Sequence, residues 1–538
     1  MSSTPLIVVG LDGGDFRYLD RFEESLPNIG RLRQNGVEAE LRSTHPPWTG
    51  SAWPSMYTGL DPSSHSVYDF FNYRGHYPDE ANIVTRNDVR SPAVWNYLSH
   101  QQRRSVVLNM PVTHPPEELR GILMPGYLAP ASSDGFPAGI RERLSEHTDG
   151  YYGIYAEHET SNQTDKKIDS YVDLIRRRGE AASGLLSAEP WDFALVQVQK
   201  TDAVFHNSSN PADFERVYRA ADSLVGALMD ACDGSPNVVL CSDHGIGPVT
   251  GYTVYVNEIL RAHELVSTTT KRDDTTLRTV KGPEEEPSDI KTNSLVSRAA
   301  DAAIEMGLSP LRIKRIAERL GVAGKARRLL PQSVRRSLSQ GVDWSESLAY
   351  CRRPSEQGVR INVEGRDGSG VVSQAEYDEV REKVISILSG LKTPEGDDVF
   401  DYVRKREEIY DGPYTEDACD VLFLPSEMNH VVSADLYGET MSPIDSFNHK
   451  RDGLFVAAGP HIDPAGCIER RSLLDVAPTL LALLEEPVPN RMQGAVPEEV
   501  LTVDVETNSY GDVSFGTTDA YGQDQTEVRD RLADLGYL

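Results

Sequence analysis

The amino-acid sequence predicts an α/β fold, in the form of a three-layer α/β/α sandwich with a mostly parallel central sheet. Two observations support this prediction. Short apolar runs alternate with longer amphipathic segments along most of the 538 residues, which is the rhythm of successive βαβ units. The chain also contains no internal repeat and no long low-complexity tract, so a repeat architecture is excluded.

The N-terminal part of the chain supplies the first of these units. The apolar run 6–11 predicts a buried strand, and residues 36–43 alternate between apolar and polar side chains, as in a strand with one exposed face. Residues 26–35 and 92–100 have the spacing of helices, and the second helix leads into an apolar strand at 105–110.

The same alternation continues after residue 160. The expected elements are a helix at about 165–188, a strand at 191–198, a helix at about 211–232, a strand at 238–240, a strand at 453–459 and a helix at 475–484. Because parallel strands need crossover connections, we expect helices on both faces of the sheet.

The alternation breaks at about residues 265–345, where a polar, proline-containing stretch precedes amphipathic helical sequence. Strand-like residues 358–362 and helical residues 374–391 then predict a smaller α+β subdomain. The expected organisation is a first part of the main α/β domain at 1–264, a helical insertion or cap at 265–345, the α+β subdomain at 346–430, the final part of the main domain at 431–500 and a C-terminal tail at 501–538.

The expected insertion carries a cluster of basic residues. Its members are Arg312, Lys314, Arg315, Arg319, Lys325, Arg327, Arg328, Arg335 and Arg336. One interpretation is a cap or docking face for an anionic substrate or partner. The alternative is a solvated helix face whose charges are balanced by neighbouring acids.

The composition is strongly acidic, with 83 Asp and Glu against 54 Lys and Arg and a formal net charge of -29. This charge argues against general affinity for nucleic acid or for an anionic membrane. A halophilic protein is expected, because high salt screens the self-repulsion of such a surface. An acidic mesophilic protein is the alternative.

The five cysteines are scattered and form no C-x-x-C pair, so the sequence suggests neither a disulfide framework nor a thiolate zinc site. The sequence shows no basic leader followed by a signal-peptide apolar region and no run of membrane-spanning length. We therefore expect a soluble, cytoplasmic protein without a transmembrane segment.

Polar residues that could bind a metal follow two of the predicted strands. Asp12 comes directly after strand 6–11, and Asp243 and His244 follow the apolar run 237–240. Parallel strands place their carboxyl ends at one edge of a sheet, so these side chains should lie close together and could hold a metal ion. The alternative is that each Asp makes only a local turn with the glycine that follows it.

Further candidates lie elsewhere in the chain. Asp202 and His206 are four residues apart, so on a helical turn they face the same way and could chelate one ion. His449 supplies another imidazole from an expected loop. Thr49 stands where a loop enters a short helix, and backbone N–H groups at a helix start can bind phosphate oxygens. The alternative for Thr49 is a simple N-cap.

Five ordered motifs carry a resemblance to a known family. They are Leu11-Asp-Gly-Gly14, the segment from Pro46 to His65, Thr201-Asp-Ala-Val-Phe-His206, Ser242-Asp-His-Gly245 and His449-Lys-Arg-Asp-Gly453. Together they resemble the alkaline phosphatase superfamily and, within it, a haloarchaeal-type member of the type I phosphodiesterase and nucleotide pyrophosphatase family. Segments 358–366, 475–480 and 531–538 extend the resemblance over nearly the whole chain.

The resemblance implies a site with two divalent metal ions, zinc being expected and manganese the alternative. Asp202, His206 and His449 would bind one ion. Asp12, Asp243 and His244, with the Thr49 oxygen, would bind the other. Thr49 would be the nucleophile, and the reaction would pass through a phosphothreonine intermediate.

One position departs from the family pattern. The family carries a phosphate-binding Asn at the position of Phe70, and this chain has Asn72 two residues later. Asn72 is therefore the expected substrate contact.

The expected function is that of a phosphodiesterase or nucleotide pyrophosphatase acting on a phosphate-ester small molecule or head group. A phosphotransferase or phosphomonoesterase acting on lipid or glycan head groups is the alternative. A sulfatase is disfavoured because no C/S-x-P-x-R motif surrounds a cysteine, and an inactive binding protein is disfavoured because all seven ligand positions are filled. The sequence specifies neither the substrate nor the oligomeric state.

Overall fold

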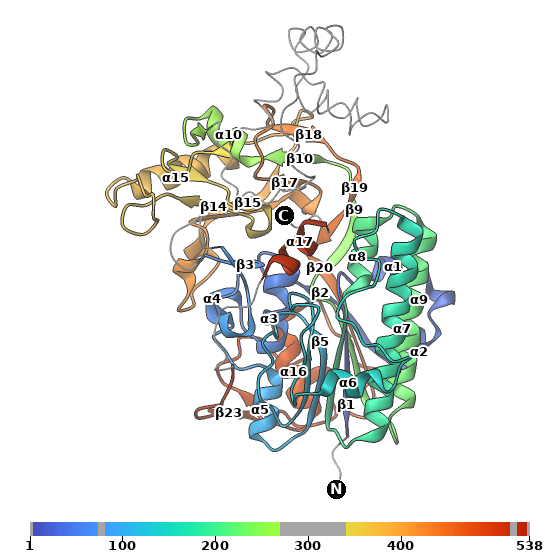
Figure 1. Cartoon of the computed structure of the whole chain (residues 1–538). Helices are drawn as coiled ribbons and strands as arrows, with labels where there is room; N and C mark the ends of the chain where they lie inside the picture. The colour runs from blue at the N-terminus through green and yellow to red at the C-terminus, as the bar shows by residue number, and fades with distance from the viewer. Residues whose placement is uncertain (1–3, 74–80, 270–340, 517–524, 535–538) are drawn as a thin grey trace.

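The computed structural model describes residues 4–73, 81–269, 341–516 and 525–534 (Figure 1). Most of the helical insertion expected at 265–345, including the basic cluster at 312–336, lies outside the described residues. None of the described helices is both long enough and apolar enough to cross a membrane.

An eight-stranded sheet forms the centre of the larger part of the molecule. Its order is β21 (Arg471–Ser472), β2 (Gly36–Arg42), β20 (Asp452–Ala458), β8 (Asn237–Cys241), β1 (Leu6–Leu11), β7 (Phe193–Val198), β5 (Ser105–Met110) and β6 (Gly121–Pro125). Strand β20 is antiparallel to both of its neighbours, and every other pairing in this sheet is parallel. The predicted mostly parallel sheet is confirmed.

Helices cover both faces of this sheet, which confirms the three-layer prediction (Figure 1). One layer contains α2 (Pro27–Gln34), α7 (Thr164–Ala188), α8 (Lys200–Asn207) and α9 (Pro211–Asp230), and the other contains α3 (Thr49–Thr58), α5 (Val94–His100) and α16 (Val476–Leu483). The ends expected for the helices of these two layers were accurate to within two residues. For example, α9 ends at Asp230 rather than at Cys232.

Burial explains why these segments form strands. All six residues of β1, β5 and β7 are buried, so their apolar side chains face helices on both sides. Strand β2 instead alternates between buried and exposed positions. The apolar side chains of the sheet and of both helical layers form one continuous core.

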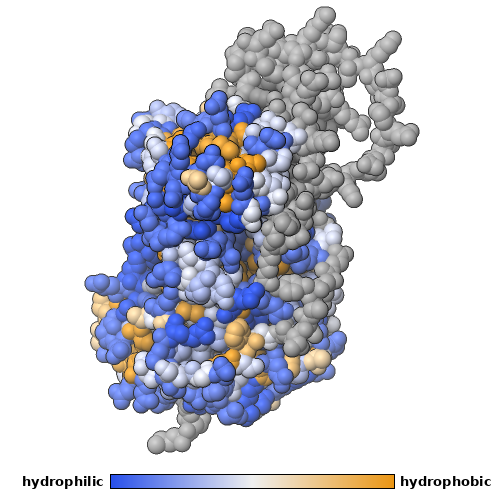
Figure 2. All heavy atoms as spheres, turned by 90° about the vertical axis from the view of Figure 1, so that its left-hand side faces the viewer, coloured by the Kyte–Doolittle hydropathy of each residue, from blue (hydrophilic) through white to orange (hydrophobic). Residues whose placement is uncertain are grey.

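A second unit lies above the carboxyl end of the sheet (Figure 1). It contains a four-stranded antiparallel sheet of β13 (Ala349–Tyr350), β14 (Gly358–Ile361), β16 (Val421–Pro425) and β15 (Phe400–Lys405), with helix α15 (Tyr377–Ser389) packed on it. It also has its own hydrophobic core. Figure 2 shows that the face of the molecule carrying α15 is mostly hydrophilic, with hydrophobic patches on both the upper and the lower lobe.

Some residues before position 264 pack with this second unit. Strand β10 (Tyr252–Tyr255) pairs with β17 (Val431–Ser433) and β18 (Met441–Pro443), and helix α10 (Val256–Ala262) contributes to the second core. The domain limits expected from the sequence remain a prediction. Helix α17 (Thr526–Asp534), in the expected C-terminal tail, lies between the two units in Figure 1.

Candidate active site

Strands β1 and β8 place the first group of candidate ligands together. They are adjacent and parallel, with Gly10 opposite Cys241, so Asp12 and Asp243 leave the sheet side by side. The backbone N–H of Gly13 donates a 3.1 Å hydrogen bond to Oδ1 of Asp243. Both carboxylates are fully buried. These two aspartates therefore share one edge of the sheet, as their positions after the strands predict.

Thr49 lies next to this pair. It is the first residue of α3, and the N-cap position belongs to Trp48, so Thr49 is not the N-cap of this helix. The Thr49 hydroxyl donates to Oδ1 of Asp12 at 3.3 Å and lies 3.5 Å from Nε2 of His244. Its hydroxyl is thus fixed among the candidate ligands, although its side chain is almost completely buried.

A second group of candidates comes from α8 and from a two-stranded ribbon. On α8, Nε2 of His206 lies 3.2 Å from Oδ1 of Asp202. His449 lies on β19 (Ser446–Lys450), which pairs with β9 (Gly245–Val249), and its Nε2 is 3.6 Å from the same Asp202 oxygen. We expected His449 in a loop. That expectation was wrong because the ribbon lies outside the central sheet and β19 lacks the apolar pattern of a buried strand.

The ribbon also joins the two groups. The rings of His244 and His449 stack with their centroids 3.8 Å apart. Ligand atoms of Asp12, Asp243 and His244 lie within 4.8 Å of one another, and so do those of Asp202, His244 and His449. The structure thus brings all seven predicted ligand positions to one place, with His244 between the two groups.

The chemistry of these residues fits divalent metal ions. The donors are carboxylate oxygens and imidazole nitrogens, which zinc and manganese accept. Oδ2 of Asp243 is buried and accepts no hydrogen bond from the described residues, which suits an oxygen that binds a cation. Cys241 does not compete with these residues as a metal ligand, because burial raises the pKa of its thiol to about 12.

The pKa shifts of the buried groups also indicate that bound cations would stabilise the site. Burial, and then the charges of Asp243 and Asp202, raise the pKa of Asp12 well above its usual range. Burial raises the pKa of Asp243 to about 6. Burial also lowers the pKa of His449 well below its usual range, so this imidazole is neutral and able to bind a metal. Several buried carboxylates in contact are costly unless cations compensate them.

Asn72 makes a hydrogen bond with a nearby acid. It lies on β3 (Phe71–Asn72), and its Nδ2 donates a 2.6 Å hydrogen bond to Oδ1 of Asp88. Its expected role as a substrate contact stays a prediction.

Asp69 is a buried acid near the nucleophile that the sequence did not single out. A Cβ atom built on Gly50 would lie 3.0 Å from the carbonyl carbon of Asp69, so this backbone passes directly beside the start of α3. Burial, followed by the charge of Glu356, raises the pKa of Asp69 to about 6. The sequence around Asp69, which follows Val67 by two residues, gives no local indication that this carboxyl is buried near Thr49.

A cavity of about 130 Å³ opens at the second group of ligands. His206, His449 and Trp48 line it from the larger unit, and the second unit supplies much of the opposite wall. The second unit therefore covers one side of the candidate active site.

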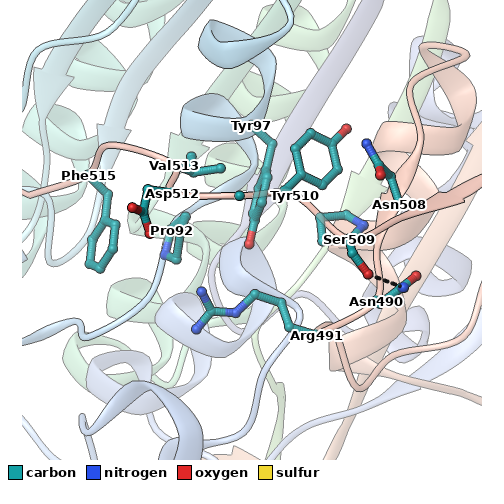
Figure 3. A pocket seen from close by; sticks show the side chains of 12 residues that line it. Pro92, Tyr97, Asn490, Arg491, Asn508, Ser509, Tyr510, Asp512, Val513 and Phe515 are labelled. Carbon is teal, nitrogen blue, oxygen red and sulfur yellow. Dashed lines mark hydrogen bonds between the residues drawn. The ribbon is translucent and has the colours of Figure 1, made fainter.

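A larger pocket of about 440 Å³ lies elsewhere, between the start of α5 and the chain segments around residues 490 and 510 (Figure 3). Tyr97, Arg491 and Tyr510 line it, and Figure 3 shows the phenol oxygen of Tyr97 directed toward the Arg491 guanidinium. It contains none of the predicted site residues.

Comparisons with known proteins found a matching family model, relatives and similar solved structures. A family model described as type I phosphodiesterase / nucleotide pyrophosphatase matches residues 6–319. The chain is 22% identical over 258 residues to venom phosphodiesterase CdcPDE from Crotalus durissus collilineatus, covering 46% of this chain and 27% of that protein. It is 23% identical over 253 residues to ectonucleotide pyrophosphatase/phosphodiesterase family member 3 from Bos taurus, covering 45% and 25% respectively. The matches thus span about a quarter of the length of these relatives.

A solved structure resembles the chain over most of its length. It is phosphonoacetate hydrolase from Sinorhizobium meliloti 1021 in complex with phosphonoformate, with a TM-score of 0.50 and 14% sequence identity. The likeness covers 90% of this chain and 95% of that one. At this identity it establishes the shared fold alone.

Proposed function

Because the chain belongs to the type I phosphodiesterase/nucleotide pyrophosphatase family, we propose that it hydrolyses phosphodiesters with Thr49 as the nucleophile. The position of Thr49 carries the proposal. Its hydroxyl lies at the start of α3, 3.3 Å from Oδ1 of Asp12 and 3.5 Å from Nε2 of His244.

Two metal ions complete the proposal. Asp202, His206 and His449 would hold one, and Asp12, Asp243 and His244, together with the Thr49 oxygen, would hold the other. Zinc suits these donors, and manganese is the alternative. When bound, the ions would lower the pKa of the Thr49 hydroxyl and neutralise charge on the phosphate.

The residues of the chain then account for the reaction. Oγ1 of Thr49 loses its proton and attacks phosphorus, the bond between phosphorus and the leaving alcohol breaks, and the leaving oxygen takes up a proton. Thr49 is then joined to phosphorus as a phosphothreonine that still carries the second ester group of the substrate. Backbone N–H groups in the first turn of α3 are suited to hold the phosphate oxygens. Water hydrolyses the Thr49 ester, releases a phosphate monoester and restores the hydroxyl.

A diester is favoured over a monoester by the charges at the site. Among the described residues that line the adjacent cavity, none is Lys or Arg. A monoester dianion is best recognised by a guanidinium or ammonium group, whereas a diester carries a single negative charge. The alternative is transfer of the phosphoryl group to an acceptor alcohol, which requires that this alcohol outcompete water at the phosphothreonine.

We also propose that the protein works in the cytoplasm of a halophile. All five cysteines are free thiols, three of them buried, which suits a reducing compartment. The net charge of -29 suits high salt.

The test uses protein that is stripped of metal and reloaded with zinc or manganese in high salt. Hydrolysis of bis-(p-nitrophenyl) phosphate should exceed that of p-nitrophenyl phosphate, and a preference for the monoester would replace the diesterase assignment with that of a phosphomonoesterase. Acid quenching should trap a phosphorylated peptide that contains Thr49. Thr49→Ala should abolish both the peptide and turnover, whereas Thr49→Ser should retain both in part, because it keeps a hydroxyl.

A further inference from the structure

The cavity beside His206 and His449 is lined by two kinds of residue, candidate metal ligands and mostly apolar side chains. The floor is formed by the two candidate metal ligands. The walls are made of Trp48, Pro354, Gln357, Pro425, Met428, His430, Val431, Val432 and Asn448. Most of these residues are apolar, and the described lining contains no Asp, Glu, Lys or Arg.

The size of the cavity limits what it can receive. Its volume is about 130 Å³. A protein cavity of about 150 Å³ accommodates benzene. A single small ring or a short alkyl chain therefore fits within it, whereas a base joined to its ribose would extend beyond it.

One buried acceptor stands in this apolar wall. Gln357 is 3% exposed, and its Oε1 accepts no hydrogen bond from the described residues. Its Nε2 is already directed to Sδ of Met428 at 3.8 Å. Leaving a buried carbonyl oxygen without a donor costs about 1–3 kcal/mol, so a bound group with a hydroxyl or N–H would recover part of that cost.

The backbone at Gln357 is held in an unusual conformation. Gln357 has φ 44° and ψ 47°, the left-handed region that favours glycine. Two hydrogen bonds fix it there, from its own N–H to the Pro354 carbonyl and from the Phe423 N–H to its own carbonyl. A strained residue held by its surroundings is typical of a functional site.

The cavity is also coupled to the metal ligands. The indole of Trp48 packs on the His449 ring with centroids 4.2 Å apart, and Trp48 directly precedes Thr49. A group seated in this cavity would therefore lie beside the ligands His206 and His449. Because the Thr49 hydroxyl lies against Asp12 and His244 of the other group, and the attacking and leaving oxygens lie roughly in line across phosphorus, this is the side of the leaving alcohol.

We propose that this cavity binds the leaving alcohol, and that this alcohol is a small, uncharged, largely apolar group with a hydrogen-bond donor that Gln357 accepts. The inference rests on the proposed function and narrows it. It makes Gln357 a residue that determines specificity, and it makes small aryl or alkyl phosphodiesters better substrates than nucleotide diesters.

Calorimetry on the zinc-loaded protein tests the size limit without turnover. Phenylphosphonate should bind at least about tenfold more tightly than adenosine 5′-monophosphate, since both carry a dianionic phosphorus group and differ mainly in the attached organic group. Equal or tighter binding of the nucleotide would overturn the inference. Failure of the protein to hydrolyse any phosphodiester would instead overturn the proposed function, and the calorimetric comparison would still stand.

Gln357 is tested with a matched pair of ligands. In wild type, 3- or 4-(hydroxymethyl)phenylphosphonate should bind about five- to tenfold more tightly than phenylphosphonate, the range expected for one recovered hydrogen bond. Gln357→Leu should remove that advantage and leave phenylphosphonate binding within about twofold. Gln101→Leu, which changes a remote glutamine, should retain the advantage. If Gln357→Leu retains the tighter binding of the hydroxymethyl compound, or weakens the binding of both compounds equally, Gln357 does not determine the specificity.

Discussion

The indole Nε1 of Trp53 donates a 3.0 Å hydrogen bond to Oδ2 of Asp12. Trp53 lies one turn after Thr49 on α3, so a single helix positions both the proposed nucleophile and a partner of its nearest carboxylate. A Cβ atom on Gly10 would lie 2.6 Å from Cη2 of Trp53, so glycine is required in β1 for the indole to cross the strand. Gln197 donates a second hydrogen bond, of 2.7 Å, to the same oxygen.

Trp53→Phe should weaken metal binding. It keeps most of the aromatic volume and removes one of the donors that orient Asp12, and loss of such a partner typically lowers metal affinity by about 10–100-fold. Zinc affinity is measured by competition with a chelating indicator. Trp95→Phe is the matched control, because Trp95 also donates a buried hydrogen bond, to Glu117, but lies away from the ligands. Equal zinc affinity of Trp53→Phe and wild type would show that Asp12 needs no such orientation.

Removing the metals should lower the thermal stability of wild type more than that of Asp243→Asn, which loses a ligand of only one of the two proposed ions. Asn removes the charge of a buried carboxylate that the site places against Asp12 and His244, so metal-free Asp243→Asn should be at least as stable as metal-free wild type. Zinc at about 100 times its Kd should stabilise wild type by about 2.7 kcal/mol. Differential scanning fluorimetry with and without zinc measures this. Asp504→Asn, an exposed aspartate, should respond to zinc as wild type does, and an equal zinc response in Asp243→Asn would remove Asp243 from the ligands.

The sequence predicted the sheet and the candidate site because both depend on local patterns. Apolar runs such as Leu6–Leu11 form buried strands wherever they occur, and residues directly after two parallel strands must share an edge. The ligand spacing of Asp202 and His206 needs only one helical turn. These features required no knowledge of the tertiary contacts.

The features that the sequence did not predict depend on contacts between distant segments. His449 was expected in a loop, but it pairs opposite Ile246 in a ribbon that no apolar pattern marks. Asp69 gains its buried position only from the packing of its backbone on Gly50 and from the nearby Glu356. The cavity wall at Gln357 forms only when the second unit meets the larger one.

Asp69→Asn should stabilise the protein at neutral pH. Burial raises the pKa of Asp69 from 3.8 to about 6, so the folded state holds this proton more tightly than the unfolded state. The resulting stability is complete below about pH 4 and is lost as the pH rises through about 6. Asn stays neutral, so Asp69→Asn should exceed wild type by up to about 3 kcal/mol at pH 8 and by little at pH 4.

Urea unfolding of metal-free protein at several pH values between 4 and 8, at constant salt, measures this difference. Asp504→Asn serves as the control and should show no such trend. A difference between Asp69→Asn and wild type that does not change with pH would mean that the Asp69 carboxyl stays ionised in the folded state.

Glu117→Gln should destabilise the fold strongly, although Glu117 lies outside the candidate active site. Glu117 and Arg86 are both fully buried, and Nε of Arg86 donates to Oε1 of Glu117 at 2.7 Å. Trp95 and the backbone N–H of Gly516 also donate to this carboxylate, so it ties three separate segments together. Removing its charge leaves the Arg86 guanidinium buried without a counterion, which typically costs about 3–5 kcal/mol.

The control is Glu180→Gln, which breaks the exposed pair with Arg176 and should cost about 0.5 kcal/mol or less. The urea midpoint of unfolding is measured for both variants. Similar losses of stability in Glu117→Gln and Glu180→Gln would show that burial does not make the Arg86–Glu117 pair more important for stability than an exposed pair.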